Sequence, residues 1–461
     1  MTQPPVRTPS FALVVLATCM AFVVGQLDVT IVNVALPAMA RELGAGVAGL
    51  QWVVDAYAVA FAAFMLSAGA LGDRFGARHA FQWGMAIFAL ASIACALAPS
   101  AGALDAARAV QGFGAAVMLP NSLALLNHAL AHDAPARARG IGYWTAAGSI
   151  SIALGPVLGG VLVSGVGWPA IFWVNVPLCA AGFWLSRSLH ETPTGHGRPP
   201  LDVAGQLIAT LLLAALIATL IESRARGVTD PLVWGGGVAT LALAAALAIV
   251  ERRAAAPVIA PDLFRLRDFR GAVFFGAVVN GSYYGAIFVI ALFLQTARHY
   301  TPIQAGLAFL PLTAGFFLSN VLSGRVITRF GTRKPMIVGA LVDLVGFGVL
   351  ALASTTASLP LMLLGFLLIP TGMGLAVPAM TTTVLSAVDK SRSALAAAIL
   401  NTARQAAGAI GVAVFGALAH GGPERIGAGL RITCAAAMVA LAFAALAAAR
   451  LKGVPPSSSN D

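Results

Sequence analysis

Residues 69–78 read Gly-Ala-Leu-Gly-Asp-Arg-Phe-Gly-Ala-Arg, and residues 324–333 read Gly-Arg-Val-Ile-Thr-Arg-Phe-Gly-Thr-Arg. The two stretches share Gly, Arg, Phe, Gly and Arg at the same spacing, and each follows a long apolar run. Duplicated halves around a central binding site are a common plan for membrane transporters. The repeat therefore predicts a duplicated chain in which these two loops are equivalent.

The apolar runs around the two loops are long enough to cross a membrane. Of the 461 residues, 59% are hydrophobic and 10% are charged, and the mean hydropathy is +0.89. Runs of about 20 apolar residues, the length of a membrane-spanning helix, recur along the whole sequence, so a cleaved signal peptide does not explain them. They do not alternate as barrel strands would. The sequence predicts an all-α membrane protein.

We expect fourteen transmembrane helices. Aligning the two loops makes helices 1–6 and 9–14 the two six-helix repeats, with helices 7 and 8 as two inserted helices between them. The expected spans are roughly 11–39, 50–72, 80–98, 102–125, 141–165, 168–187, 203–221, 232–250, 271–296, 303–323, 335–354, 359–386, 393–418 and 431–450. The expected domains are an N-terminal segment (1–10), the first repeat (11–187), a linker (188–202), the inserted helices (203–250), a second linker (251–270), the second repeat (271–450) and a disordered cytoplasmic tail (451–461).

Basic residues are distributed unequally over the loops. With the N-terminus in the cytoplasm, twenty of the 28 Lys and Arg residues lie on the cytoplasmic side and six on the other, while Arg108 and Arg404 lie inside spans. Cytoplasmic loops of membrane proteins carry such an excess. We therefore expect both termini to be cytoplasmic, and we explain the net charge of +11 by membrane orientation rather than by nucleic-acid binding.

Four further motifs accompany the loop at 69–78. They read Leu-Asp-Val-Thr-Ile-Val-Asn-Val-Ala-Leu-Pro at 27–37, Trp-Val-Val-Asp-Ala-Tyr at 52–57, Arg-Ala-Val-Gln-Gly-Phe-Gly at 108–114 and Gly-Pro-Val-Leu-Gly-Gly at 155–160. Together the five motifs resemble those of the major facilitator superfamily, and specifically of its fourteen-helix drug:proton antiporter branch. The resemblance covers essentially the whole chain and implies a major facilitator fold.

The resemblance implies that the loop at 69–78 is a conformational latch that stabilises one access state. Its candidate residues are Gly69, Asp73, Arg74, Gly76 and Arg78. Asp73 can accept hydrogen bonds from a neighbouring helix N-terminus or pair with a basic residue, and the glycines allow close backbone approach. A solvated loop acid is the alternative for Asp73. The second-half loop has Thr328 at the position of Asp73.

The motif in the expected fifth helix resembles the antiporter motif of that branch, and we expect it to serve conformational change rather than chemistry. It consists of Gly155, Pro156, Gly159 and Gly160. Proline interrupts the hydrogen bonding of the helix, and the glycines permit a kink and tight contact between helices.

Three of the seventeen acidic residues fall well inside expected helices: Asp28, Asp55 and Asp343. A carboxylate inside a bilayer is expensive unless it is neutralised, so each is a candidate functional group. At a rise of 1.5 Å per residue, Asp28 lies about 13 Å, Asp55 about 7 Å and Arg108 about 9 Å from the outer ends of their helices. These three charges are therefore expected to share the outer half of the first repeat.

We expect Asp28, Asp55 and Arg108 to couple transport to protons. Burial and a neighbouring guanidinium act in opposite directions on the proton affinity of a carboxylate, so a change in separation would load or release a proton. The resemblance implies the same role for Asp28 and Arg108. A structural ion pair and the wall of a water-filled cavity are the alternatives, and Asp55 could also attract a cationic substrate.

Other polar residues inside the spans are candidates to line a substrate cavity. They are Asn33, Gln111, Asn280, Tyr283, Tyr284, Asn401, Arg404 and Gln405. Helix packing is an equally plausible role for those on the ninth expected helix. Arg404 has two possible roles: it pairs with another residue of the bundle, or it binds an anionic group of the substrate. Asp343, for which we expect a structural role, is one possible partner of Arg404.

We expect neither an enzyme nor a metal site. The chain has no Gly-rich phosphate loop followed by Lys and Ser, and its four cysteines show no CxxC spacing. His128 and His132 lie at a loop edge, where solvation is expected rather than metal binding. Without a nucleotide site and with no cofactor, transport must be driven by an ion gradient.

The sequence thus predicts a multi-pass protein of the bacterial inner membrane that exports small amphipathic or cationic compounds in exchange for protons. We expect the lipid bilayer, a small-molecule substrate and protons as partners, no nucleic acid, and a monomer. The alternatives are an exporter of one endogenous metabolite or antibiotic, a uniporter or channel, and a membrane-embedded enzyme.

Overall fold

The computed structural model describes residues 10–192, 203–253, 262–356, 358–389, 392–419 and 423–455. Within these ranges the regular structure is entirely helical. The expected segment 1–10 apart from its last residue, most of the linker 188–202, residues 254–261 of the second linker and residues 456–461 of the tail lie outside the described residues. The expected domain division stays a prediction.

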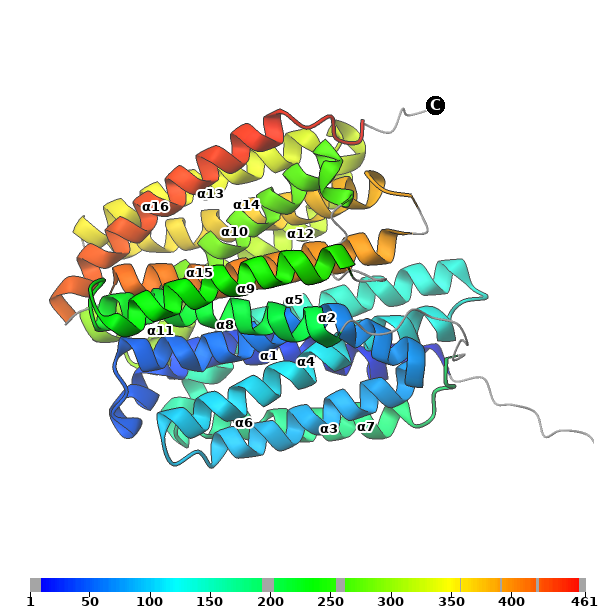
Figure 1. The fold of residues 1–461 in the computed structure, drawn as a ribbon, viewed down its shortest axis with the longest axis horizontal. Coiled ribbons are helices and arrows are strands. Elements are labelled where there is room, and N and C mark those ends of the chain that lie inside the picture. The colour runs from blue at the N-terminus through cyan, green and yellow to red at the C-terminus, as the bar shows by residue number, and fades with distance from the viewer. Residues whose placement is uncertain are drawn as a thin grey trace, which may run out of the picture.

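The first half of the chain forms one bundle of long helices (Figure 1). Within it, α3 and α2 pack against α4, and α1 packs against α5. Its elements are α1 (Phe11–Leu43), α2 (Val47–Phe75), α3 (Ala77–Ala96), α4 (Ala101–Ala129), α5 (Ala134–Gly165), α6 (Ala170–Trp173) and α7 (Asn175–Ser186).

The second half forms a second bundle beside the first, with α13 against α14 and α10 against α15 (Figure 1). Its elements are a 3₁₀ turn (Leu263–Arg265), α10 (Arg267–Leu292), a π-helical turn (Phe293–Ala297), α11 (Pro302–Ala308), α12 (Leu310–Phe330), α13 (Arg333–Thr356), α14 (Leu359–Ser386), α15 (Ser393–Leu418) and α16 (Pro423–Ala449). Between the halves in sequence, α8 (Val203–Ala225) pairs with α9 (Pro231–Arg253) and contacts both α2 and α15.

Twelve of the described helices are long and apolar enough to cross a membrane, and the number is thirteen if the bent α5 counts as one span. The expected count of fourteen differs because two helices are interrupted. In α5 the axis turns by 41° between Ile152 and Leu154, and Pro156 lies four residues after Ile152, whose carbonyl it cannot pair with. The expected sixth helix breaks after Trp173, four residues before Pro177, for the same reason.

The two ends of the described chain lie on the same side of the bundle, at the right in Figure 1. We name this the terminal side, where α1 begins and α16 ends, and we name the opposite side the distal side. Side-chain hydrogen bonds join the two halves on the distal side. Gln51 Nε2 donates to the carbonyl oxygens of Val412 and Ala413 at 3.1 and 2.9 Å. Gln295 Nε2 donates to Val34 O at 3.0 Å.

Backbone contact between α5 and α11 seals the same side. A Cβ on Gly306 would lie 2.3 Å from Pro156 O, and one on Gly160 would lie 2.7 Å from Pro302 O. Glycine is needed at both positions because any side chain would force the halves apart. Along α15, residues 401–407 are partly exposed, whereas most of 408–419 is buried. The halves are therefore packed together at the distal side.

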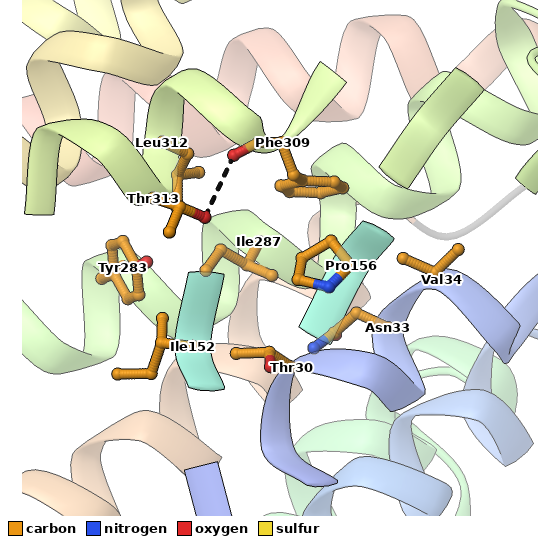
Figure 2. Close-up of a pocket in the computed structure, with 10 residues that line it drawn as sticks. All are labelled: Thr30, Asn33, Val34, Ile152, Pro156, Tyr283, Ile287, Phe309, Leu312 and Thr313. Atoms are coloured by element: carbon orange, nitrogen blue, oxygen red, sulfur yellow. Dashed lines mark hydrogen bonds between the residues drawn. The ribbon is translucent and has the colours of Figure 1, made fainter. Parts of the chain in front are cut away.

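Next to this seal, side chains of both halves enclose a small void (Figure 2). Thr30, Asn33 and Pro156 line it from the first half, and Tyr283 and Phe309 are among the residues that face them from the second. Its volume of about 10 Å³ is at the lower limit for one water molecule. The junction of α1, α5, α10 and α12 is thus closed as well.

The start of the C-terminal tail is docked rather than free. Thr332 N donates to Val454 O at 3.0 Å, Val454 N donates to Thr332 Oγ1 at 2.9 Å, and Lys452 N donates to Asp268 Oδ1 at 3.1 Å. Leu451 is buried. The expectation of a disordered tail is therefore wrong for residues 451–455, because this segment supplies partners to the turn between α12 and α13.

Candidate functional site

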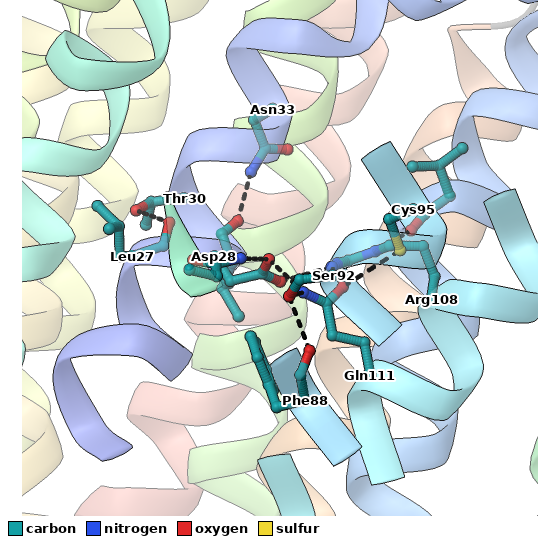
Figure 3. Close-up of polar contacts among 12 residues, drawn as sticks. Leu27, Asp28, Thr30, Asn33, Phe88, Ser92, Cys95, Arg108 and Gln111 are labelled. Carbon is teal, nitrogen blue, oxygen red and sulfur yellow. Dashed lines mark hydrogen bonds and ion pairs between the residues drawn. The ribbon is translucent and has the colours of Figure 1, made fainter. Parts of the chain in front are cut away.

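A polar network between α1 and α4 contains Asp28 and Arg108 (Figure 3). Arg108 Nη1 donates to Asp28 Oδ2 at 2.5 Å and to Gln111 Oε1 at 2.6 Å. Gln111 Nε2 donates in turn to Asp28 Oδ1 at 2.9 Å. Asp28 and Gln111 are fully buried and Arg108 is 1% exposed. The two charges thus form an ion pair that Gln111 bridges.

Two further side chains complete the network. Asn175 Nδ2 donates to Asp28 Oδ1 at 3.0 Å, and Gln111 Nε2 also donates to Ser92 Oγ at 2.9 Å. Both oxygens of Asp28 therefore accept hydrogen bonds, as a buried carboxylate requires. The sequence interpretation missed Asn175 and Ser92. A lone Asn within the apolar run Phe-Trp-Val-Asn-Val-Pro at 172–177 was the available signal for the first.

The guanidinium of Arg108 is held on its other faces by α2. Its Nε donates to Val53 O at 3.0 Å, and its central carbon lies 4.4 Å from the ring centroid of Tyr57. A cation over an aromatic face gains electrostatic stabilisation that increases when water is excluded. The network therefore links α1, α2, α3, α4 and α7.

Asp55 is buried on α2 in a different environment. It is fully buried, and neither of its carboxylate oxygens has a hydrogen-bond partner among the described residues. Gln51, one helical turn earlier on α2, contacts α15, and Val59, one turn later, packs with Ala409 and Ala413 of α15. Residues four apart lie on one helix face, so Asp55 lies at the contact between α2 and α15. The structure does not pair Asp55 with Arg108.

A cavity of about 40 Å³ lies between the halves beside the network. Polar side chains of both halves reach it, namely Asn33, Tyr57, Arg108, Tyr284 and Gln405, and the remaining wall is apolar. The Tyr57 hydroxyl is buried and has no hydrogen-bond partner among the described residues. Mostly apolar walls with a few polar groups are typical of sites for amphipathic ligands. A volume of this size holds only about three water molecules, so the cavity has to widen to admit a substrate.

The expected cavity residues divide into three groups. Asn33, Tyr284 and Gln405 line this cavity, and Tyr283 lines the smaller void with Asn33. Gln111 does not line a cavity, because it is buried in the Asp28 network. The others, Asn280, Asn401 and Arg404, form a separate cluster on α10 and α15.

Asp343 and Arg404 do not form an ion pair in the structure. Asp343 is 3% exposed on α13 and faces α14, where a Cβ on Gly372 would lie 2.3 Å from its Oδ1. Arg404 instead approaches Asn280 of α10. The possible Asp343–Arg404 partnership is therefore not made.

Glu191 binds the turn between α2 and α3 on the terminal side. Its Oε1 accepts from Arg78 N at 2.8 Å, its Oε2 accepts from His79 N at 3.2 Å, and its Oε2 lies 3.5 Å from Arg78 Nε. Thr192 Oγ1 accepts from Ala77 N at 2.8 Å. An acid at a helix N-terminus satisfies free N–H groups and complements the helix dipole. Glu191 thus occupies a position that the sequence interpretation had considered for Asp73, whose side chain lies outside the described part.

Gly76 makes this contact possible. Its φ of +93° lies in the region that favours glycine, and a Cβ there would lie 2.3 Å from Glu191 Cδ. Arg74 is exposed beside Phe75, with 5.8 Å from its guanidinium carbon to the ring. The turn between α12 and α13 is held in a similar way, because Thr332 in this turn exchanges hydrogen bonds with Val454, which follows α16.

The glycines of the fifth-helix motif allow close contact with α1 and α11. A Cβ on Gly155 would lie 1.9 Å from Thr30 Oγ1, and one on Gly159 would lie 2.9 Å from Ile31 Cγ1. With Gly160 and Pro156 at the α11 contact, the whole motif lies at helix interfaces. Within the described ranges, no group of three or more His, Cys, Asp or Glu residues is placed to hold a metal ion.

A family model described as "Major Facilitator Superfamily" matches residues 18–412 of the chain. Curated relatives are similar over most of their length. A "Methylenomycin A resistance protein" of Streptomyces coelicolor is 38% identical over 408 residues, which are 88% of this chain and 85% of that protein. A "Multidrug resistance protein Stp" of Mycobacterium tuberculosis is 36% identical and covers 88% of this chain and 75% of its own. The "Drug efflux pump JefA" of the same species is 34% identical, with 89% and 81% covered.

Solved structures share the fold at low sequence identity. A mutant form of the "peptide transporter POT" superposes with a TM-score of 0.72 at 16% identity and covers 95% of this chain and 94% of its own. A mutant form of the "nucleoside transporter NupG" gives a TM-score of 0.68 at 13% identity, with 95% and 99% covered. At these identities the likeness concerns the fold alone.

Proposed function

The chain belongs to the major facilitator superfamily, and on that premise we propose that it exports small amphipathic or cationic compounds in exchange for protons. The relatives are named for resistance to antibiotics and for drug efflux, which supports an exporter of the multidrug type. It is a transporter rather than an enzyme, and we propose that a proton gradient, with no cofactor, supplies its energy.

One observation carries the proton coupling: a fully buried carboxyl group, that of Asp55, lies without a partner among the described residues at the contact between α2 and α15. An unpaired buried carboxylate costs several kcal/mol, about enough to keep the group neutral and therefore protonated while the contact is closed. Separation of α2 from α15 admits water from the distal side. In that state Asp55 exchanges its proton with the distal solution.

Asp28 and Arg108 form the second part of the proposed coupling. Arg108 contacts Asp28 and also lines the cavity. A proton on Asp28 would cancel the charge that holds the guanidinium, and Arg108 would then be free to move toward the cavity. Proton binding and cavity shape are thereby coupled through one side chain.

We further propose that the terminal side is cytoplasmic and the distal side periplasmic, in a bacterial inner membrane. The excess of Lys and Arg in loops on the terminal side supports this orientation. The structure then represents a state closed to the outside, because Gln51, Gln295 and the α5–α11 contact join the halves there. A monomer suffices for this cycle, since both halves of the cavity come from one chain.

The fourteen-helix drug:proton antiporter branch is our proposal for the finer family position. Counting the bent α5 as one span and the broken α6 and α7 as another raises the twelve spans to fourteen. The pair α8 and α9 is the insertion between the six-helix repeats, and its contact with α2 and α15 supports a role beside the moving interface.

The loop at 69–78 is proposed as a latch on the terminal side, together with Glu191. Arg78 and Gly76 both contact Glu191 in the present state. We propose that Gly69, Asp73 and Arg74 belong to the same latch, in line with the family resemblance. The fifth-helix glycines and Pro156 are proposed as the pivot that lets α5 leave α11 when the distal side opens.

The test is efflux from proteoliposomes with an imposed pH gradient, screened over a chemically diverse panel. We expect uphill substrate movement that stops when a protonophore collapses the gradient. Downhill flux that is unaffected by the protonophore would instead indicate a uniporter or channel. Uphill transport of one panel member alone would favour the second candidate, an exporter of a single compound, which the relatives named for methylenomycin A and tetracenomycin C support.

A further inference from the structure

Arg108 and Arg404, the two arginines inside the expected membrane spans, have opposite surroundings. Arg108 makes an ion pair with Asp28 and hydrogen bonds to Gln111 and Val53. Arg404 on α15 has no acidic partner among the described residues. Its contacts are Asn401 Oδ1 at 3.5 Å from Nη1 and Asn280 Oδ1 at 3.4 Å from Nη2, both at the long limit of hydrogen bonding. Within the described part of the chain, its charge is therefore uncompensated.

One hydrogen-bond donor of Arg404 has no acceptor in the part of the chain that the structure describes. The Nε–H of Arg404 is buried without a partner among the described residues. Both amides that approach Arg404 turn their oxygens toward it, and Asn280 Nδ2 donates away from it to Gly276 O at 3.0 Å. A cation with a buried donor that lacks an acceptor attracts an anion rather than a cationic compound.

Arg404 also lies where a substrate can reach it. It is eleven residues after the start of α15 and fourteen before its end, close to the middle of a membrane span. It is partly exposed, as are its neighbours from Asn401 to Ala407, which lie on the terminal side of the distal seal. Gln405 lines the central cavity, and a Cβ on Gly408 would lie 3.2 Å from the ring of Tyr284, which also lines it.

We propose that Arg404 binds the carboxylate of an amphipathic substrate whose apolar part lies beside Tyr284 and Gln405 when the cavity between the halves is widened. The proposal rests on the proposed export function and narrows its substrate class to organic monoanions. A planar guanidinium fork matches the two oxygens of a carboxylate, which a lysine cannot do. The side chains of Asn401 and Asn280 orient the fork in the empty state and yield to the stronger acceptor.

The experiment measures binding to purified protein in detergent, with three fluorescent pairs that each consist of a dansylated apolar amino acid and its methyl ester. The two members of a pair share the rings and differ by one negative charge. We expect the wild type to bind the acids about tenfold or more tightly than the esters, the usual strength of a charge-assisted contact. In Arg404→Gln this preference should vanish through loss of acid affinity, while ester affinity stays within about twofold.

Two further variants separate the local role from general effects. Arg404→Lys keeps the charge without the fork and should give an intermediate preference for the acids. Arg431→Gln removes one positive charge from an exposed position on α16 and should leave the preference unchanged. Unchanged ester binding in Arg404→Gln reports that the protein is folded.

The proposal is overturned if the wild type shows no preference for the acids across the three pairs. A wild type that binds neither the acids nor the esters also overturns it. It is also overturned if Arg404→Gln weakens acids and esters equally, or if Arg431→Gln has the same effect as Arg404→Gln. These measurements need no gradient, so they are independent of the proteoliposome assay. Gradient-driven export of esters and cations with no acid preference would retain the proposed function and reject the carboxylate site.

Discussion

The ion pair between Asp28 and Arg108 gives the sharpest prediction. In Asp28→Asn, the side chain keeps its shape, but the amide cannot change its protonation state. Its amide N–H groups must also face a donor, because Gln111 Nε2 and Asn175 Nδ2 donate to Asp28 Oδ1 and Arg108 Nη1 donates to Oδ2. We expect the variant to insert and fold but to lose proton-driven transport.

The magnitude follows from the burial of the pair. Arg108 is 1% exposed, so the charge left without its partner is not hydrated. Breaking a buried pair by removing one member costs about 3–5 kcal/mol, whereas replacing both members costs much less. Gln111 Oε1 and Val53 O still accept from the guanidinium, which favours the lower part of that range. The double variant Asp28→Asn/Arg108→Gln should therefore be more stable than Asp28→Asn alone.

Two assays check this cycle. Thermal unfolding of the purified variants in detergent should rank the wild type first, the double variant second and Asp28→Asn last. Efflux from proteoliposomes with an imposed pH gradient should be absent in both variants, while exchange of substrate without a gradient can persist. Arg108→Lys should retain more transport than Arg108→Ala, because it keeps the charge.

Full gradient-driven efflux by Asp28→Asn would refute the assignment of Asp28 to proton coupling. Additive stability losses in the double variant would refute the coupling of the two charges, because independent sites add and interacting sites do not.

Four other outcomes follow from the structure. Asp55→Asn should stabilise the closed contact between α2 and α15 and make transport independent of distal pH; a pH profile that matches the wild type would remove Asp55 from the mechanism. Gln51→Ala deletes the two hydrogen bonds to α15, each worth about 0.5–1.5 kcal/mol. A cysteine placed in the distal half of α15 should then be labelled severalfold faster by a reagent added on the distal side. An unchanged labelling rate would contradict the seal. Glu191→Gln removes the charge at the α3 N-terminus and should slow turnover while substrate binding in detergent survives; unchanged turnover would show that Glu191 only caps the helix. The hydrogen bond from the Arg392 guanidinium lowers the pKa of the exposed Asp262 carboxyl. The ion pair between these two residues is therefore complete above the ordinary pKa of aspartate and is lost as the pH falls below about 4. Titration of Asp262 by NMR, with Arg392→Gln as the control, can check this.

Several features of the fold could be predicted because they depend on local sequence. Hydropathy located the helices, and the bounds of α14 and α15 agree with the expected ones. The helix count differed at α5 and at α6 and α7, where Pro156 and Pro177 remove backbone donors. The sequence contained both prolines, but apolar content alone does not register a lost hydrogen bond.

The sequence also identified which residues carry charge inside the membrane, because any ionisable group there is costly and rare. It placed Asp28, Asp55 and Arg108 at similar depths, since a helix has a fixed rise per residue. Depth does not specify rotation about the helix axis. Only the tertiary structure brought Asp28 to Arg108 and left Asp55 at the contact with α15.

The same limit applies to partners that are distant along the chain. Nothing near Arg78 in the sequence indicates that Glu191, more than a hundred residues later, binds the α3 N-terminus. The apolar run around Asn175 marks this residue as unusual but does not indicate that its partner is Asp28. Composition and local pattern were enough to predict that this chain is a bundle of membrane helices, and its duplicated plan stays a prediction. Helix packing decided which polar groups satisfy one another and which, such as Arg404, are left for a ligand, because hydrogen bonds between helices require both the right depth and the right face.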